Sequence, residues 1–302
     1  MLLAVEPHTG LRPLLEIVRQ AHHSLDVEVY ELTDRALLDA IRNAAARGVR
    51  VRVILDRTPW GTPRWRIARE ARRVRATGAR LRWAPTRFEH IGRRYAFDHA
   101  KFLCTRHVCE LGTANFGWDA FHRNREYLLV THRPRVVAAL RRVFEADWTG
   151  RRAGPRAHRI LVLSPGTSQG DLLRVLRQPG PVEVESEELG ADWAVLRAMV
   201  RKASALHLLL PASLSRADDR NVARLTAGGV CVRLLPTRPL YLHAKMIVGD
   251  AFGFVGSENF TPTSLRRNRE VGLLLRNPAL LERLRAVFAR DWSHGRPIGA
   301  CP

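Results

Sequence analysis

Lysine, cysteine and long apolar segments are all scarce in this chain of 302 residues. Only three of its 50 basic residues are lysines, so arginine carries nearly all of the positive charge. No apolar run approaches the roughly 18–20 residues that span a bilayer, which excludes a transmembrane helix. The first residues contain no basic region followed by a long apolar stretch, so they do not read as a signal peptide, although a leader removed earlier would leave no trace.

The few cysteines argue against two further classes of protein. Cys104, Cys109, Cys231 and Cys301 are too few and too irregularly spaced for a disulfide framework or a zinc site. We therefore expect free thiols in or near strands. No carboxylate, histidine or cysteine cluster has metal-ligand spacing either, so we expect no metal and no other cofactor.

The composition is that of a globular protein with a strong positive charge. Hydrophobic residues make up 46% of the chain and charged residues 26%, and the length favours two lobes or one large α/β unit. The formal net charge of +21 implies a polyanionic partner, which is a nucleic acid, an anionic lipid surface or a phosphorylated substrate.

One segment holds an excess of this charge. Residues 57–106 contain 14 basic side chains against three acidic ones, and tryptophans are interleaved with them. Arg66, Arg69 and Arg73 lie near Trp60 and Trp65, a mixture suited to binding phosphates while flat rings stack or anchor. These arginines are therefore candidate substrate-binding residues, and a solvated arginine-rich helix is the alternative.

The second half of the chain repeats the first. At an offset of 144, residues 99–148 align with 243–292 without a gap, and 18 of the 50 pairs are identical. The identities cluster in four motifs, which are His-Ala-Lys, Gly-x-x-Asn-Phe, Arg-Asn-Arg-Glu and a final Asp-Trp. Such a long period indicates a duplicated unit of roughly 150 residues instead of a short-repeat solenoid.

The upstream parts of the two copies also match. Residues 24–32 alternate like a strand, Thr33 or Asp34 caps a helix that Gly48 ends, and residues 49–55 alternate again. Residues 181–189, 192–203 and 206–210 repeat this β-α-β order. We therefore predict two tandem α/β lobes, at residues 1–152 and 158–302, with mixed sheets flanked by helices and a pseudo-twofold axis between them. Residues 150–155 form the linker.

Each copy places a histidine and a lysine two residues apart on a strand. His99 and Lys101 in the first copy, and His243 and Lys245 in the second, fall on one face because strand side chains alternate. Two of the chain's three lysines occupy these equivalent places. A compact ammonium where arginine is the usual cation suggests a tight pocket for a phosphate oxygen.

The residues downstream of each lysine complete such a pocket. An asparagine amide donates to phosphoryl oxygens, a hydroxyl lies beside it, and a carboxylate 27 residues after each histidine fixes the tautomer of its imidazole. The matched pairs are Asn115 with Asn259, Thr113 with Ser257, and Glu126 with Glu270. Two such lobes facing each other predict a phosphodiester site.

With these motifs the chain resembles the phospholipase D superfamily, and the Arg-Asn-Arg-Glu element is similar to its bacterial cardiolipin-synthase-like branch. The family signature is a duplicated His-x-Lys-x4-Asp followed by Gly-Ser/Thr-x-Asn. The second copy fits it with Asp250, whereas the first has Arg106 in place of the aspartate. That aspartate is usually structural in the family, so we expect activity without it.

The resemblance implies a bilobal α/β fold and a metal-free displacement in two steps. One histidine forms a phosphohistidine while the other protonates the leaving oxygen, and water or an alcohol then takes the phosphoryl group. The family's roles make His99 the nucleophile and His243 the general acid.

Three functions remain open. The first is a phospholipase D or phosphatidyltransferase acting on anionic phospholipid. The second is a nuclease of the same superfamily, favoured by the charge, and the third is a non-catalytic polyanion-binding protein. A cytoplasmic or membrane-peripheral location is expected, a secreted or periplasmic one stays open, and a monomer is favoured over an oligomer.

The lobes differ just before the first His-x-Lys. The segment from Pro85-Thr-Arg87 to His99 is seven residues longer than its counterpart from Pro236-Thr-Arg238 to His243. A loop that leads into the catalytic strand lies at the rim of the cleft. We therefore expect the loop residues Arg93, Arg94 and Tyr95 to contact substrate, and a tolerated surface insertion is the alternative.

Overall fold

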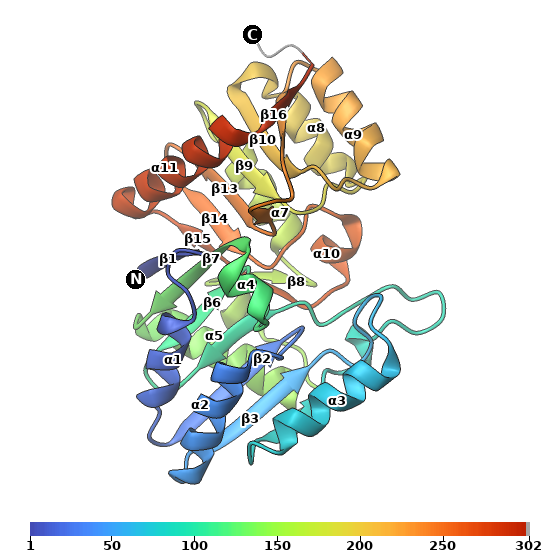
Figure 1. The fold of residues 1–302 in the computed structure, drawn as a ribbon. Coiled ribbons are helices and arrows are strands. Elements are labelled where there is room, and N and C mark those ends of the chain that lie inside the picture. The colour runs from blue at the N-terminus through green and yellow to red at the C-terminus, as the bar shows by residue number, and fades with distance from the viewer. Residues whose placement is uncertain (300–302) are drawn as a thin grey trace.

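Two α/β lobes stack on each other in the computed structural model, which describes residues 1–299 (Figure 1). The first lobe runs from the blue to the green part of the chain and the second from yellow to red. Cys301 lies outside the described residues. No helix in the described part of the chain is both long and apolar enough to cross a membrane.

The elements of the first lobe are β1 (Leu2–Glu6), α1 (Arg12–Arg19), β2 (Ser24–Val29), α2 (Arg35–Ala46), β3 (Arg50–Leu55), α3 (Arg64–Arg75), β4 (Arg80–Trp83), a 3-10 turn (Thr86–Phe88), β5 (Lys101–Cys104), β6 (Cys109–Gly112), α4 (Trp118–His122), β7 (Asn124–Thr131) and α5 (Pro134–Trp148). Those that follow are α6 (Pro155–His158), β8 (Val162–Ser164), α7 (Ser168–Leu176), β9 (Val182–Ser186), α8 (Trp193–Val200), a 3-10 turn (Ala203–Ala205), β10 (Leu206–Pro211), α9 (Arg216–Ala227), β11 (Cys231–Leu235), β12 (Tyr241–Leu242), β13 (Lys245–Gly249), β14 (Gly253–Gly256), α10 (Pro262–Arg266), β15 (Glu270–Leu275), α11 (Pro278–His294) and β16 (Arg296–Ile298).

The two sheets have the same strand order, which confirms the predicted fold class. The first runs β1-β7-β6-β5-β2-β3-β4, and the second runs β8-β15-β14-β13-β9-β10-β11 with β16 added at its edge. In each sheet three strands joined by helices are parallel, and the strands that carry the repeated motifs are antiparallel. The division at residues 152 and 158 stays a prediction.

The helix cap and the glycine turn that the sequence predicts in the first lobe are both present. Asp34 caps α2 by accepting the amide hydrogen of Leu37 at 2.9 Å, and Gly48 takes a φ of +85° where the chain turns into β3. All six residues of β2 are buried, including the polar ones, because this strand lies in the interior of the sheet, parallel to β3 and antiparallel to β5. The buried Asp26 is paired with Arg52 at 2.8 Å.

The lobes share one hydrophobic core. The long helices α5 and α11 contribute Phe144 and Phe288 to a single buried cluster that also contains Phe102 of the first sheet and Met246 of the second. Burial of apolar surface therefore holds the two lobes together, and each lobe also has a separate core on its outer side.

Two buried ion pairs cross between the lobes and explain part of the repeat. The arginine before the glutamate in each Arg-Asn-Arg-Glu motif reaches the aspartate of the Asp-Trp motif in the other lobe. Arg125 Nη2 lies 2.9 Å from Asp291 Oδ1, and Arg269 Nε lies 2.6 Å from Asp147 Oδ2. Both motifs therefore serve the packing of the lobes.

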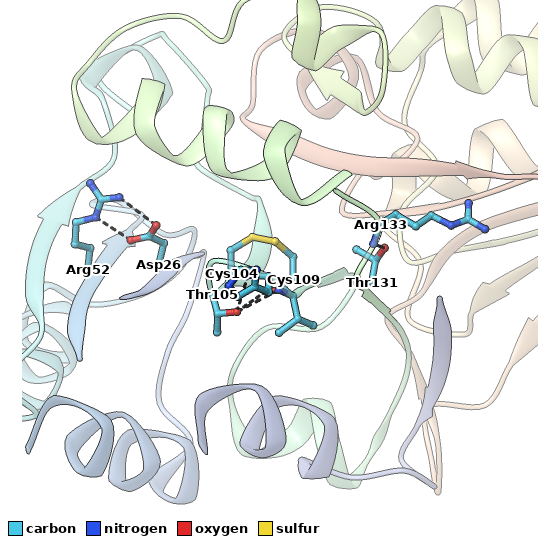
Figure 2. The surroundings of a disulfide bond; sticks show 9 residues. Asp26, Arg52, Cys104, Thr105, Cys109, Thr131 and Arg133 are labelled. Carbon is cyan, nitrogen blue, oxygen red and sulfur yellow. Dashed lines mark hydrogen bonds and ion pairs between the residues drawn. A yellow bond between two sulfur atoms is a disulfide. The ribbon is translucent and has the colours of Figure 1, made fainter. Parts of the chain in front are cut away.

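The expectation of free cysteines is wrong. Cys104 and Cys109 face each other across the antiparallel ladder of β5 and β6 and form a disulfide (Figure 2), and no cysteine among residues 1–299 is a free thiol. Spacing alone could not show this, because a separation of five residues permits a disulfide only when the chain reverses in a tight hairpin.

The matching hairpin of the second lobe is held differently. Its turn carries the signature aspartate, and Asp250 Oδ1 accepts from Arg285 Nη2 at 2.8 Å. Asp250 lies at the exposed end of the hairpin and ties it to α11 through this ion pair. In the first lobe the disulfide closes the hairpin whose turn has Arg106 at the equivalent position.

Candidate active site

The two His-x-Lys segments meet because the residues just before each histidine pair with a strand of the opposite lobe. β12 lies parallel to the start of β7, and Asp98 pairs with Arg269 in the same way. The backbone amide of His99 donates to the carbonyl oxygen of Arg269 at 2.9 Å. Each histidine is therefore fixed beside the Arg-Asn-Arg-Glu segment of the other lobe, at the pseudo-twofold axis.

The glutamates pair with the histidines across the lobes. His99 Nδ1 lies 3.0 Å from Glu270 Oε2, and His243 Nδ1 lies 2.8 Å from Glu126 Oε1. We expected each glutamate to hold the histidine of its own copy, and this pairing is wrong. Its physical reason is the strand pairing across the axis, which a spacing of 27 residues within one copy does not reveal.

Both glutamates are built to stay ionised. Burial raises the pKa of each carboxyl, but the facing histidine, the neighbouring lysine and the hydroxyl donor together bring it below its usual value. Glu270 accepts hydrogen bonds from Ser257, Ser264 and Asn268, and Glu126 accepts from Thr113. An ionised carboxylate at Nδ1 leaves Nε2 of each imidazole to do the chemistry.

Two hydroxyls that the sequence assigned to substrate act on these glutamates instead. Thr113 Oγ1 donates to Glu126 at 2.5 Å and Ser257 Oγ donates to Glu270 at 2.6 Å, and both residues are fully buried. In this structure they orient the carboxylates.

The two lysines are buried beside the histidines. Lys101 Nζ and Lys245 Nζ each donate to the carbonyl oxygen of their own histidine at 2.6 Å. Burial, with Lys245 adding to it, lowers the pKa of Lys101 to about 7 against the opposing pull of Glu270. Burial also lowers the pKa of His99, so its neutral form is favoured.

Both asparagines follow the strands that neighbour the lysines. The side-chain oxygens of Asn115 and Asn259 are buried and have no hydrogen-bond partner among the described residues. An unpaired buried acceptor needs a donor, which an ordered water can supply, whereas the Nδ2 amide of each asparagine is the group that can donate to a phosphoryl oxygen. Their placement is consistent with the predicted contact to phosphoryl oxygens.

The arginines of α3 line a cavity beside this site. Arg66, Arg69 and Arg73, with Glu70 and Tyr30, surround a volume of about 240 Å³. The ring of Tyr30 lies 5.1 Å from the ring of His99, so a single aromatic side chain separates the cavity from the histidine. The arginines predicted to bind substrate are therefore next to the site.

One residue of the inserted loop, Arg94, is placed differently from what we expected, and substrate contact by Arg93 and Tyr95 stays a prediction. Arg94 turns back and donates to the carbonyl oxygens of Thr86 and Glu89 within its own loop. Tyr95 packs edge-to-face against Trp60, with ring centroids 5.3 Å apart, and Arg93 is exposed. The loop therefore packs Tyr95 against Trp60 of lobe 1 and holds the Arg94 guanidinium within the loop.

The sequence reasoning missed Glu187. Its Oε2 lies 2.7 Å from Lys245 Nζ and 3.3 Å from His243 Nε2. The signal was available in the repeat. Residues 27–32 (Val-Glu-Val-Tyr-Glu-Leu) align with residues 184–189 (Val-Glu-Ser-Glu-Glu-Leu), and one of their two differences falls at the residue that follows the strand. No group of three or more histidine, cysteine or acidic side chains within residues 1–299 is placed to hold a metal ion.

Solved structures share this fold over nearly the whole chain. Polyphosphate kinase from Porphyromonas gingivalis superposes with a TM-score of 0.71 at 16% identity and covers 99% of this chain, which spans 48% of that protein. Phosphatidylserine synthase from Haemophilus influenzae Rd KW20 has a TM-score of 0.71 at 11% identity, over 98% of this chain and 87% of that one. At these identities the likeness shows the fold alone.

Sequence comparison with families is more specific. No curated protein sequence matches the chain significantly. The family described as "Cardiolipin synthase, PLD-like domain" matches residues 14–148 and 189–292, which include every repeated motif. The chain therefore belongs to the cardiolipin-synthase-like family of the phospholipase D superfamily.

Proposed function

We propose that the protein is a phosphodiesterase or phosphatidyltransferase that works through a phosphohistidine on phospholipids. The observation that carries the proposal is the convergence of two crossed His–Glu pairs and two buried lysines at one place. Members of the superfamily are phosphodiesterases and phosphotransferases, and this geometry fits that chemistry.

In the first step Nε2 of one histidine attacks phosphorus. A nitrogen–phosphorus bond forms, the bond from phosphorus to the leaving oxygen breaks, and the other histidine gives its Nε2 proton to that oxygen. The neutral form favoured for His99 suits the nucleophile, and Glu270 stabilises the positive charge that its ring gains on attack.

In the second step water or an alcohol attacks the same phosphorus. Its proton passes to the histidine that gave one up, a new oxygen–phosphorus bond forms, and the nitrogen–phosphorus bond breaks. Lys101, Lys245 and the two asparagine amides stabilise the negative charge on the non-bridging oxygens throughout. Positive charge from the two lysines therefore performs the electrostatic part of the reaction.

Lipid is favoured as substrate by the surface next to the site. Trp60, Trp65 and Ile91 are 65%, 57% and 52% exposed, and Arg66 and Arg69 stack on the Trp65 ring. Tryptophan and an aliphatic tip among arginines suit peripheral contact with an anionic bilayer, where the rings lie at the headgroup level. Figure 1 shows α3 and the loops beside it projecting from one side of lobe 1.

A nuclease is the second candidate, and the arginine-lined cavity supports it. A nucleic-acid strand carries a phosphate on either side of the scissile one, and Arg66, Arg69 and Arg73 could hold such a neighbour. An aliphatic residue such as Ile91 adds little to the stacking of bases, whereas it inserts readily into lipid.

The deciding experiment compares turnover in excess EDTA of phosphatidylglycerol vesicles, phosphatidylcholine vesicles, single-stranded DNA and duplex DNA. We expect turnover of lipid, with loss of activity in His99→Ala and in His243→Ala. Cleavage of DNA alone would establish the nuclease, and no turnover of any of the four would leave the protein as a polyanion binder. Activity that EDTA removes and a divalent ion restores would overturn the two-histidine mechanism.

The disulfide bears on where the enzyme works. We propose a secreted or periplasmic location over a cytoplasmic one, because disulfides such as Cys104–Cys109 are rare in reducing compartments. Trapping thiols with a maleimide in intact source cells tests this, since full labelling of both cysteines before reduction would contradict it.

A further inference from the structure

One position breaks the pseudo-twofold symmetry of the site. In the first sheet Val29 pairs with Lys101, and in the second Ser186 pairs with Lys245. The next residues, Tyr30 and Glu187, therefore occupy equivalent places at the ends of equivalent strands. One lobe presents an aromatic ring at this place and the other presents a carboxylate.

The carboxylate of Glu187 is held inside the site. It lies 2.7 Å from Lys245 Nζ and 3.3 Å from His243 Nε2, and its side chain is only 18% exposed. Burial alone would raise the pKa of Glu187, but His243 and Lys245 bring it down to about 2, so the group is a carboxylate at any physiological pH. Tyr241 donates to its other oxygen at 3.4 Å.

The two histidines consequently face different surroundings. His243 has Glu126 near Nδ1 and Glu187 near Nε2, so a carboxylate lies at each ring nitrogen. His99 has Glu270 at Nδ1, and the Tyr30 ring packs edge-on against its imidazole. Of the two histidines, His243 therefore has a carboxylate acceptor placed at each ring nitrogen, and His99 has one at Nδ1.

Glu187 also occupies a place that a substrate needs. A phosphoryl oxygen bound in this half of the site would contact Lys245 Nζ and His243 Nε2, and these are the atoms that Glu187 Oε2 contacts in the resting enzyme. In the other half Lys101 Nζ faces the Tyr30 ring at 5.4 Å, which is no anion. The anion position is therefore filled from within on one side only.

We propose that Glu187 is a positioning residue that makes two otherwise matched histidines unequal. It keeps His243 as the proton donor and covers the anion position of the second lobe until a substrate phosphate displaces it. The proposal rests on the proposed phosphodiester chemistry. It adds a carboxylate within the protein that competes with the substrate anion for Lys245 and His243.

Other charges around Glu187 have to be considered in the test. Glu188 follows it in the chain, and burial, with the charge of Glu187 adding to it, raises the pKa of Glu188 to about 7. His99 and Lys101 act on Glu187 from across the axis at longer range. Among the described residues Glu188 makes no hydrogen bond or ion pair with His243 or Lys245, although the charge of Lys245 acts on it at longer range, which makes Glu188→Gln the matched control.

The first measurement needs no turnover. Calorimetric titration with inorganic phosphate should show about 10-fold tighter binding in Glu187→Gln than in the unsubstituted protein, because the competing charge is gone. Glu188→Gln should change the affinity much less. Equal or weaker binding in Glu187→Gln, or the same gain in both variants, would overturn the competitor role.

The second measurement separates proton donation from attack. With an alkyl phosphodiester, whose leaving oxygen needs a proton, Glu187→Gln should lower kcat by about 10-fold or more. With a 4-nitrophenyl phosphodiester, whose leaving group needs none, kcat should stay within about twofold. An equal loss on both esters would show a merely structural role.

These outcomes are distinct from failure of the proposed function. If the unsubstituted enzyme hydrolyses neither ester, the phosphodiester chemistry is wrong. The phosphate titration still decides whether Glu187 competes with a bound anion. If the enzyme is active and Glu187→Gln matches it in both measurements, the function stands and the role of Glu187 is refuted.

Discussion

Replacing Lys101 by methionine should stabilise the fold while abolishing activity. The ammonium of Lys101 is fully buried, and burial lowers its pKa from 10.5 to about 7. Below about pH 7 the folded protein holds a charge that its surroundings disfavour. Between about pH 7 and pH 10.5 the unfolded chain still binds a proton that the folded protein has released, so the free energy of unfolding rises with pH.

The size of the effect follows from the same shift in pKa. At about 1.4 kcal/mol for each pH unit, holding the charged lysine in the fold costs on the order of a few kcal/mol near pH 6. Methionine has a similar shape and no charge, so Lys101→Met should raise the free energy of unfolding by about 2–4 kcal/mol at that pH. The gain should shrink toward pH 9.

The equivalent lysine provides a control of opposite sign. Lys245 Nζ is 2.7 Å from Glu187, so Lys245→Met leaves a mostly buried carboxylate without its closest cation. This variant should lose on the order of 1–3 kcal/mol of stability. The difference between two lysines at matched positions comes from the single exchange of Tyr30 for Glu187.

Urea unfolding in phosphate-free buffer near pH 6 and near pH 9 measures both variants. The reasoning fails if Lys101→Met is less stable than the unsubstituted protein near pH 6, or if its gain is the same at both pH values. It also fails if the two methionine variants change stability in the same direction.

Three further predictions follow from contacts that the sequence alone did not reveal. Glu270→Gln should slow turnover of a 4-nitrophenyl phosphodiester more than Glu126→Gln does, because Glu270 holds the attacking histidine; the reverse order in steady-state kcat would restore pairing within each lobe. Replacing Cys104 and Cys109 together by alanine should lower the free energy of unfolding by about 2 kcal/mol, and unchanged urea midpoints would show that the bond contributes nothing. Asp291→Asn leaves a buried arginine unpaired and should cost about 3–5 kcal/mol, so a thermal midpoint equal to that of the unsubstituted protein would refute the interlobe role.

Patterns along the chain were sufficient for the fold and pointed to most residues of the candidate site. The period of 144 residues predicted two equivalent lobes, and alternation and capping predicted the β-α-β order that the sheets confirm. The scarcity of lysine singled out Lys101 and Lys245. These features are local or recur in both copies of the repeat, so no knowledge of distant contacts was needed.

Contacts between distant residues depended on the tertiary structure. His99 and Glu270 are 171 residues apart, and only the pairing of one lobe's strands with the other brings them together. The Cys104–Cys109 bond needs a tight hairpin, and Glu187 matters because the fold aims it at His243 and Lys245. A sequence names which groups are present, but the distances between them, and hence their ionisation and their roles, come from how the two lobes pack.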